Sequence, residues 1–177
     1  MTSEARTQFQ TAYYVSDVEQ AVARWNRLFG AGPFVLLHHY RMEKLWVHGE
    51  PVDPATGPDF SYALGYLGDL MIQFTTQHDG APSVYRDMYS RGQEGFHHVA
   101  HLTGEFEAEV ARLVDMGFDI GMQFEVDGAQ GAYLDTRAAT GGFTEIHSNP
   151  QPLLDTFADW RRAHALWKAG DPVILNP

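Results

Sequence analysis

The feature that most constrains the fold of this chain is an internal repeat. The tripeptide Val22-Ala23-Arg24 recurs as Val110-Ala111-Arg112, an offset of 88 residues. The same offset carries Gln10, which precedes the first copy, onto His98, which precedes the second. Self-similarity at a fixed spacing is the mark of a repeated structural unit. The sequence therefore predicts two related modules in which Gln10 and His98 hold equivalent positions.

Each module also ends in a segment that alternates between apolar and polar residues, which is typical of a half-buried strand. Gln73 lies in the middle of this segment in the first module, and Glu145 lies in the middle of it in the second. Side chains of both types can bind a divalent ion through oxygen. Together with the pair matched by the offset, they could bring four metal-capable side chains to one centre.

Length and composition favour one soluble domain over residues 1–177. The chain has no cysteine, which excludes thiolate zinc sites, iron–sulfur clusters and thiol nucleophiles. Its 12 basic and 23 acidic side chains give a net charge of −11, which disfavours nucleic acid and anionic membranes as partners. The sequence shows no secretory signal and no apolar run long enough to span a membrane, so we expect a cytoplasmic protein.

The apolar periodicity of the first half predicts the order β-α-β-β-β. Its strands are expected at residues 8–15, 33–40, 60–67 and 70–76. The helix is expected to begin with a capping box made by Ser16 and Glu19 and to end at Gly30. Gly68-Asp69 is typical of a tight hairpin turn. Residues 41–59 are rich in proline and glycine and are expected to form a long loop, a flap over the site.

The second half repeats this plan, which gives an α+β fold of two tandem βαβββ modules. Its elements are predicted as a strand at 96–102, a helix from Phe106 that stops at Gly117, and strands near 120–126, 131–135 and 142–147. The units are expected as module one at about 8–76, a connecting helix at about 82–91, module two at about 96–148 and a C-terminal helix at about 152–169. Both of the additional helices are interpreted as packing elements.

Strand alternation predicts which of these side chains share a face. Successive residues of a strand point to opposite sides of the sheet. On this rule the four metal-capable residues can line one concave face of the sheet. His97 and His101 are expected to lie on the opposite face from His98, and we interpret both as structural.

Several segments, in this order and at this spacing, resemble the vicinal oxygen chelate superfamily. They are Tyr14-Val15-Ser16-Asp17-Val18, Gly95-Phe96-His97-His98-Val99-Ala100, Tyr133-Leu134-Asp135 and Gly141-Gly142-Phe143-Thr144-Glu145-Ile146. The superfamily contains the glyoxalases, methylmalonyl-CoA epimerase, extradiol dioxygenases and bleomycin-resistance proteins, and the chain looks most like its epimerase-like branch. The resemblance covers about residues 8–148 and implies one open, cup-shaped mixed β-sheet, the glyoxalase fold.

By position, the metal ligands of that superfamily fall on four residues of this chain: Gln10, Gln73, His98 and Glu145. The chain departs from the epimerase pattern at the first of these, where the epimerases would have histidine. Glutamine there resembles some glyoxalase I enzymes, which would have glutamate where Gln73 stands.

One imidazole, one carboxylate and two amide oxygens form a hard, mostly oxygen site. Such a site favours one divalent ion per chain, with Mn, Co, Ni or Zn as the candidates. A Lewis acid of this kind can bind two neighbouring substrate oxygens and stabilise an enolate. We therefore expect a metal-dependent isomerase, epimerase or lyase that acts on a small carbonyl compound. An extradiol-type dioxygenase is disfavoured, because an Fe(II) facial triad has two histidines and Gln10 takes the place of one.

The reaction also requires a base. Glu145 is the first candidate, as a ligand that leaves the metal, and Glu43 and Glu50 on the predicted flap are alternatives. The substrate pocket is expected to be lined by Tyr14, His38, Met71, Phe96, Phe143 and His147.

A metal-free protein that sequesters an apolar or aromatic molecule in the same cup is the alternative function, because fold does not fix function. The acidic balance and the presence of only two lysines, Lys44 and Lys168, argue against a CoA thioester as ligand. A homodimer is expected from the exposed sheet edges and the aromatic C-terminal helix.

Overall fold

The two predicted modules are joined in a single curved sheet in the computed structural model, which describes residues 7–175. The first module contains β1 (Thr7–Tyr14), α1 (Val18–Phe29), β2 (Phe34–Tyr40), β3 (Lys44–Val47), β4 (Glu50–Val52), β5 (Phe60–Leu67) and β6 (Leu70–Gln77), and is followed by α2 (Val84–Met88). The second contains β7 (Gly95–Thr103), α3 (Phe106–Asp115), β8 (Ile120–Val126), β9 (Ala129–Leu134), α4 (Arg137–Thr140) and β10 (Phe143–Ser148). Helix α5 (Gln151–Leu166) and β11 (Ile174–Leu175) end the described chain.

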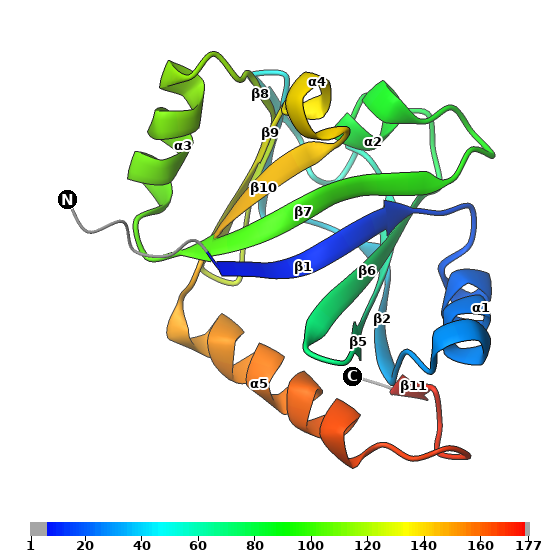
Figure 1. Cartoon of the computed structure of the whole chain (residues 1–177). Coiled ribbons are helices and arrows are strands. Elements are labelled where there is room, and N and C mark those ends of the chain that lie inside the picture. The colour runs from blue at the N-terminus through cyan, green and yellow to red at the C-terminus, as the bar shows by residue number, and fades with distance from the viewer. Residues whose placement is uncertain (1–6, 176–177) are drawn as a thin grey trace.

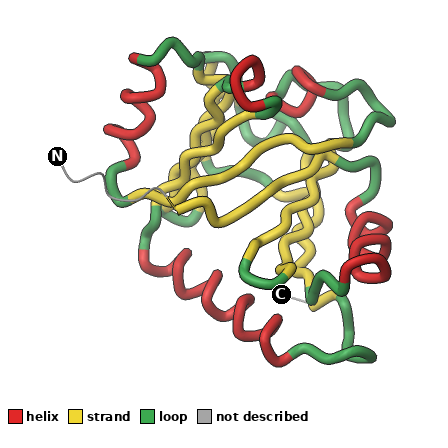
Figure 2. The backbone as a smooth tube through the Cα atoms, viewed as in Figure 1, coloured by secondary structure: helices red, strands yellow, loops and turns green. Residues whose placement is uncertain are grey.

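The strand order of the sheet is β11-β2-β5-β6-β1-β7-β10-β9-β8-β3-β4. The first strands of the two modules, β1 and β7, pair antiparallel at its centre, and each has the last strand of its own module, β6 or β10, as a parallel neighbour on its outer side. Figure 1 shows this central pair crossing the view, with α1 and α3 on opposite sides. The predicted α+β fold with an open mixed sheet is confirmed, and strands occupy the middle of the molecule with helices around them (Figure 2).

Both ends of helix α1 are determined by residues close in the sequence. It ends at Gly30, which adopts the left-handed conformation that glycine tolerates, at φ 70°. Its N-cap is Asp17, whose carboxylate accepts a hydrogen bond from the Gln20 amide at 3.0 Å. The predicted capping box was therefore wrong by one residue, because the Ser16 amide lies outside the helix and donates to Glu94 at 2.9 Å.

The predicted flap at residues 41–59 was wrong in its central part. Residues 44–52 form a hairpin, β3–β4, and β3 pairs with β8 of the second module. His48 and Gly49 make the turn with φ values of 51° and 83°, the left-handed conformation that two-residue hairpin turns require. Pro51 lies on β4, the edge strand, where a missing amide hydrogen costs nothing in the ladder. The first module thus extends the sheet of the second.

Helix α5 crosses the opposite side of the sheet from α1, and both helices contact β5. The face of β5 toward α1 carries Ala63, whereas the other face carries Tyr62 and Leu64, which belong to a core cluster with Phe157 and Trp160 of α5. No α5 side chain is fully buried. Within residues 7–175, no helix is both long and apolar enough to cross a membrane.

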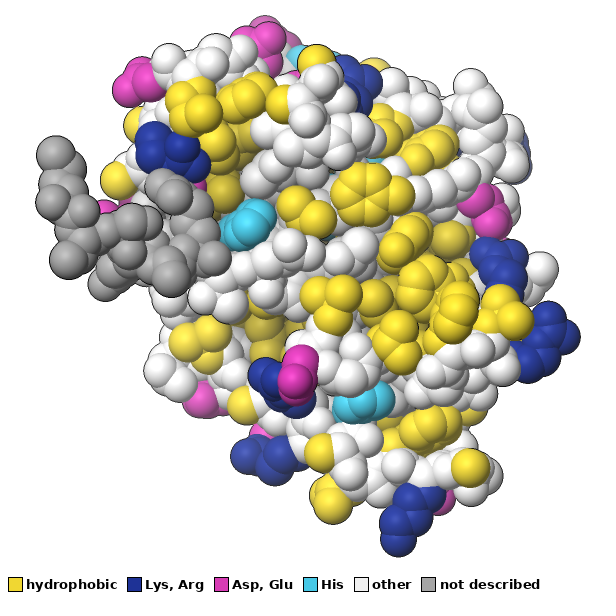
Figure 3. Space-filling model, viewed as in Figure 1, with side chains coloured by type: hydrophobic (Ala, Val, Ile, Leu, Met, Phe, Trp, Pro, Cys, Tyr) yellow, Lys and Arg dark blue, Asp and Glu magenta, His cyan; other side chains and the backbone are white. Residues whose placement is uncertain are grey.

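Aromatic side chains form a continuous row across the α1 side of the sheet. The Phe96, Tyr13, Trp25 and Phe29 rings contact one another in sequence, with centroid distances of 6.2, 4.9 and 5.1 Å. Phe29 is 56% exposed. Figure 3 shows hydrophobic side chains gathered on this face beside α1. The group of hydrophobic side chains beside α1 is the most extended one on the face drawn in Figure 3.

Candidate functional site

The four metal-capable residues singled out in the sequence occupy two neighbouring rows at the centre of the sheet. Gln10 on β1 and Glu145 on β10 share one row, because both pair with the same residue of β7. Gln73 on β6 and His98 on β7 share the next row, because both pair with the same residue of β1. The structure therefore brings all four together, two from each module.

The residues between them in these rows are Ala12 on β1 and Ala100 on β7, both fully buried. They are 88 residues apart, the same offset that relates the two modules. A methyl side chain at each position leaves room for longer side chains to meet above the central strands. The repeat thus places a small residue and a polar residue at equivalent points of both modules.

The four side chains contact one another in pairs. The Gln10 Nε2 group donates to Oε1 of Gln73 at 2.6 Å, and Nε2 of His98 lies 3.1 Å from Oε2 of Glu145. All four residues are buried. Burial of a polar group costs free energy unless the group is hydrogen-bonded. This cluster is therefore part of the core of the protein and not a set of surface side chains.

His97 lies against His98, contrary to the sequence prediction. The pairing of β7 with β1 shifts by one residue here, with His98 opposite Ala12 and Phe96 opposite Tyr13, so His97 is the extra residue of a β-bulge. A bulge interrupts the alternation of faces. His97 and His98 are both fully buried, and their Nδ1 atoms are 2.8 Å apart. The expectation that His97 points away from His98 was therefore wrong.

A chain of hydrogen bonds fixes the tautomer of His98. Nε2 of His97 lies 3.1 Å from the carbonyl oxygen of Val84, and a carbonyl only accepts, so this nitrogen carries the hydrogen. Burial lowers the pKa of His97 well below its usual value, so the ring is neutral and its Nδ1 is a bare acceptor. Nδ1–H of His98 then donates to it, which leaves the His98 Nε2 atom with a free lone pair.

The His98 Nε2 atom is the ring nitrogen that faces Glu145, and no hydrogen bond to it is formed among the described residues. Burial lowers the pKa of His98 to about 3, so the imidazole is neutral near pH 7. A buried, neutral histidine with an unsatisfied lone pair is the form in which histidine binds metal ions.

Glu145 is the carboxylate of the cluster, and its burial favours the protonated, neutral form. Burial raises its pKa to about 7, an effect that His147 and a hydrogen bond with the Tyr133 hydroxyl partly offset. The Tyr133 hydroxyl lies 3.4 Å from that of Tyr85, and burial raises the pKa values of both tyrosines, so both remain protonated. A carboxyl group with a pKa near 7 can take up and return a proton at neutral pH.

A cavity of about 490 Å³ lies above this cluster and ends under α5. Gln10, Gln73, Glu145 and Tyr133 form its polar end. The remaining lining residues are mostly apolar: Phe9, Leu37, Tyr40, Met42, Tyr62, Leu64, Phe124, Val126, Asp127, Ala129, His147, Pro152, Leu153, Thr156, Phe157 and Trp160. A concave apolar space with a few converging polar groups is the usual form of a small-molecule site.

Of the six residues expected to line the substrate pocket, only His147 lines this cavity. Tyr14 and Met71 are buried in the core, and Phe96 contacts the Tyr13 ring on the α1 side. His38 is exposed, 3.6 Å from Glu19. Strand alternation alone could not separate the cavity from the core that surrounds it.

Glu43 and Glu50, the alternative bases, are both exposed and do not line the cavity. Glu50 begins β4, and Glu43 directly precedes β3, where its amide donates to the Glu125 carbonyl of β8. Two contributors to the site were not predicted from the sequence: His97 and the inner face of α5. The apolar stripe of α5 was visible in the sequence, but it was interpreted as packing alone.

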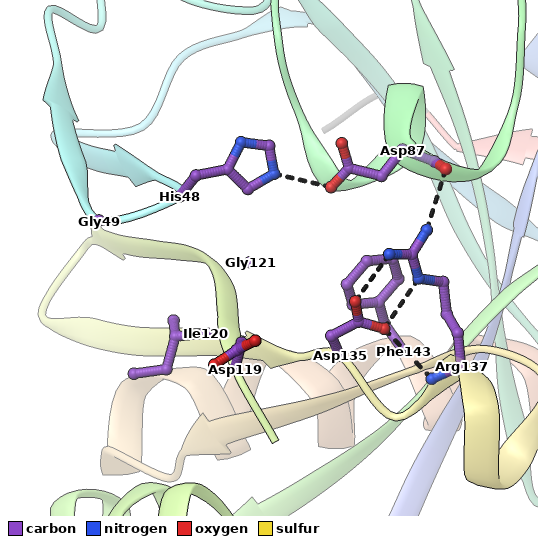
Figure 4. A pocket seen from close by; sticks show the side chains of 9 residues that line it. All are labelled: His48, Gly49, Asp87, Asp119, Ile120, Gly121, Asp135, Arg137 and Phe143. Carbon is purple, nitrogen blue, oxygen red and sulfur yellow. Dashed lines mark hydrogen bonds and ion pairs between the residues drawn. The ribbon is translucent and has the colours of Figure 1, made fainter. Parts of the chain in front are cut away.

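A second cavity, of about 620 Å³, lies between the β3–β4 turn, α2 and α4 (Figure 4). Four of its polar side chains contact one another or nearby backbone: His48 contacts Asp87 at 2.8 Å, and Arg137 contacts Asp135 at 2.6 Å and the Asp87 carbonyl at 2.9 Å. The Arg137 guanidinium also lies 4.9 Å from the centre of the Phe143 ring, which places this expected pocket residue on the second cavity. We interpret these contacts as structural ties between three elements.

The comparison with known families agrees with this geometry. The sequence pattern of the Glyoxalase/Bleomycin resistance protein/Dioxygenase superfamily matches residues 9–135, more than half of the chain. This chain belongs to that superfamily. The match begins on β1 and ends just after β9, so it includes Gln10, Gln73 and His98, and the chain continues beyond it into β10 and α5. No curated protein sequence matches the chain.

Solved structures with the same fold include methylmalonyl-CoA epimerases. The enzyme from Mycobacterium tuberculosis is 14% identical, with a TM-score of 0.58 over 88% of this chain and 96% of that one. A hypothetical protein from Bacillus halodurans is 19% identical, with a TM-score of 0.58 over 84% and 97%. A variant of the Streptomyces coelicolor epimerase in complex with 2-nitronate-propionyl-CoA is 14% identical, with a TM-score of 0.53 over 83% and 97%. At these identities the likeness is one of fold.

Proposed function

We propose that this protein is a divalent-metal-dependent isomerase, epimerase or lyase that acts on a small carbonyl compound. The observation that carries the proposal is the free lone pair on Nε2 of His98, which the hydrogen bond to His97 fixes and which faces the Glu145 carboxylate. The epimerases of the same fold support an isomerase-type reaction on a carbon acid.

The donor set fits a divalent ion. His98 would supply a nitrogen, Glu145 a carboxylate oxygen, and Gln10 and Gln73 one amide oxygen each. This set has one negative charge and no sulfur, which suits Mn, Co, Ni or Zn. The Gln10–Gln73 contact lies within the first module and the His98–Glu145 contact within the second, and the shared rows of the sheet bring the two pairs side by side, which supports this donor set.

The bound ion would supply the positive charge that stabilises an enolate. The residues of the chain transfer the proton, orient the base and exclude water. Glu145 removes the proton from the carbon beside the carbonyl and returns it, or passes it on, and the burial that raises its pKa in the metal-free protein makes its carboxylate a stronger base. The Tyr133 hydroxyl orients this carboxyl group, and the apolar walls of the cavity exclude water from it.

Metal titration of the chelator-treated protein tests this proposal and its pH dependence. We expect about one ion per chain by calorimetry at pH 8. Since the pKa of Glu145 is raised to about 7, the carboxyl group holds a proton below that pH, and this proton must leave before the ion binds. The metal affinity should therefore fall roughly tenfold per pH unit below pH 7 and level off above it.

Glu145→Gln provides the control for this titration, because it removes the titrating group. Its affinity should be lower at pH 8 but nearly independent of pH between 6 and 8, since the pKa of His98 lies near 3. The absence of saturable heat with all four ions would contradict the metal proposal. The apolar cavity would then support the alternative function, a metal-free protein that sequesters an apolar molecule.

We also propose that the protein forms a homodimer through the aromatic face beside α1. Leu28 and Phe29 at the end of α1 are 59% and 56% exposed, and the Phe29 ring continues the aromatic row through Trp25, which makes a contiguous apolar patch of the kind that marks an interaction surface. Replacement of both by aspartate should shift the sedimentation mass from two chains to one. A mass near one chain for the unmodified protein at micromolar concentration would refute the dimer.

A further inference from the structure

The cavity above the four central residues has a strongly uneven distribution of charge. Its carboxylates are Glu145 at the polar end and Asp127 at the rim, and none of the described lining residues is lysine or arginine. A phosphate or carboxylate at the α5 end of the cavity, away from the proposed ion, would therefore lie without a lysine or arginine partner. The α5 end of the cavity therefore disfavours an anionic group.

Aromatic rings line the wall between the sheet and α5. Phe9 on β1 stacks on Phe157 at a centroid distance of 5.4 Å and an interplanar angle of 24°, and Phe157 contacts Trp160 at 5.7 Å. On the other side, His147 contacts Phe9 at 6.2 Å and Phe124 at 5.7 Å. The apolar wall is therefore continuous from the strands onto the helix.

Polar contacts also hold helix α5 against the sheet. The Tyr66 hydroxyl donates to the Phe157 carbonyl at 3.2 Å, and Arg161 forms an ion pair with Asp69 in the β5–β6 turn. Leu153, Phe157 and Trp160 are only half-buried, because part of their surface faces the cavity. Apolar surface that faces a cavity gains free energy when an apolar ligand covers it.

We infer that the substrate of this site is a carbonyl compound that carries a bulky, uncharged apolar group, preferably an aromatic ring, which lies between the sheet and α5. The inference that the substrate is a carbonyl compound rests on the proposed function, whereas the inference that it carries an apolar group rests on the cavity alone. A phosphate group placed under α5 would find no lysine or arginine among the residues that line the cavity.

A matched pair of fluorescent probes tests the inference on the unmodified protein. N-phenyl-1-naphthylamine is uncharged, and 8-anilino-1-naphthalenesulfonate has the same ring skeleton with an added sulfonate. Both are titrated against chelator-treated protein, so the result does not depend on the metal or on the reaction. We expect saturable binding of the uncharged probe at about one per chain, at least tenfold weaker binding of the sulfonate, and no displacement of the uncharged probe by CoA.

Variants of α5 locate the binding site. Trp160→Ala and Phe157→Ala should each weaken binding of the uncharged probe by roughly fivefold or more, because each removes a large part of the aromatic wall. Leu166→Ala, at a residue of the same helix that is 74% exposed and does not line the cavity, is the control and should leave the affinity within twofold.

Equal affinities for the two probes, displacement by CoA, or no effect of the Trp160 and Phe157 variants would overturn the inference. Binding of the uncharged probe in a protein that takes up no metal would leave the inference about the apolar group intact and reject the proposed reaction. Metal uptake without probe binding would leave the proposed reaction intact and reject the inference about the apolar group. No α5 side chain is fully buried, so these variants should keep the far-ultraviolet circular dichroism of the unmodified protein.

Discussion

Replacement of Glu145 by glutamine is expected to reduce proton exchange by about 100- to 10,000-fold, the usual contribution of a positioned general base. Glutamine keeps the shape of the side chain and one oxygen, but it cannot take up a proton near pH 7. The measurement is the loss of the carbon-bound proton signal in deuterated water by NMR. A suitable probe is 2-hydroxyacetophenone, an uncharged aromatic ketone with two neighbouring oxygens and exchangeable protons.

The matched control for this experiment is Glu43→Gln. Glu43 is exposed and does not line the cavity, so exchange should stay at the rate of the unmodified protein. Loss of exchange in Glu43→Gln, with full exchange in Glu145→Gln, would assign the base to Glu43 and reject the role proposed for Glu145. Metal content must be measured in both variants, so that loss of a base is distinguished from loss of the ion.

The parts of the fold that the sequence predicted well are set by short-range interactions. The turn at Gly68-Asp69 joins β5 and β6 within a residue of the predicted positions, because turn chemistry and alternation are both local. The end of α1 at Gly30 is equally local. The repeat offset also placed Gln10 and His98 at equivalent points of the central strands, where the structure places both.

The features that the sequence did not predict depend on contacts between distant segments. The β3–β4 hairpin is stabilised by pairing with β8, so its proline and glycine residues suggested a loop when they were considered alone. The inner face of α5 shows the same limit, because an apolar stripe on a helix has the same period whether it packs on a core or lines a cavity. Only the position of α5 over the sheet distinguishes these two roles.

The β-bulge at His97 is the most informative of these differences. Strand alternation would place His97 and His98 on opposite faces, and only the register of β7 against β1 shows the extra residue. Bulges are frequent next to functional sites because they redirect a side chain. Here the bulge brings the His97 ring to the His98 ring, which gives a role to the second histidine of the His97-His98 pair.

Substitutions of these two histidines are expected to separate a ligand from the residue that positions it. His98→Ala removes a proposed ligand and should weaken metal binding by more than tenfold. His97→Leu removes the acceptor for Nδ1–H of His98 and should weaken binding by roughly 10- to 100-fold, the usual effect of losing such an outer partner. His101→Ala, on the same strand, should stay within twofold of the unmodified protein.

A conservative variant and a spectroscopic readout distinguish positioning from simple loss of packing, because His97 also stacks on Tyr85 at 4.2 Å. His97→Asn places an amide oxygen near the position of the lost Nδ1 atom, so it should recover most of the metal affinity that His97→Leu loses. Two-bond proton–nitrogen NMR of the metal-free protein should show His98 protonated at Nδ1 in the unmodified protein and in His97→Asn, but a mixture of tautomers in His97→Leu. Unchanged metal affinity and an unchanged His98 tautomer in His97→Leu would show that Nε2 of His98 is directed by some other contact, and the relay through His97 to the Val84 carbonyl would have to be abandoned.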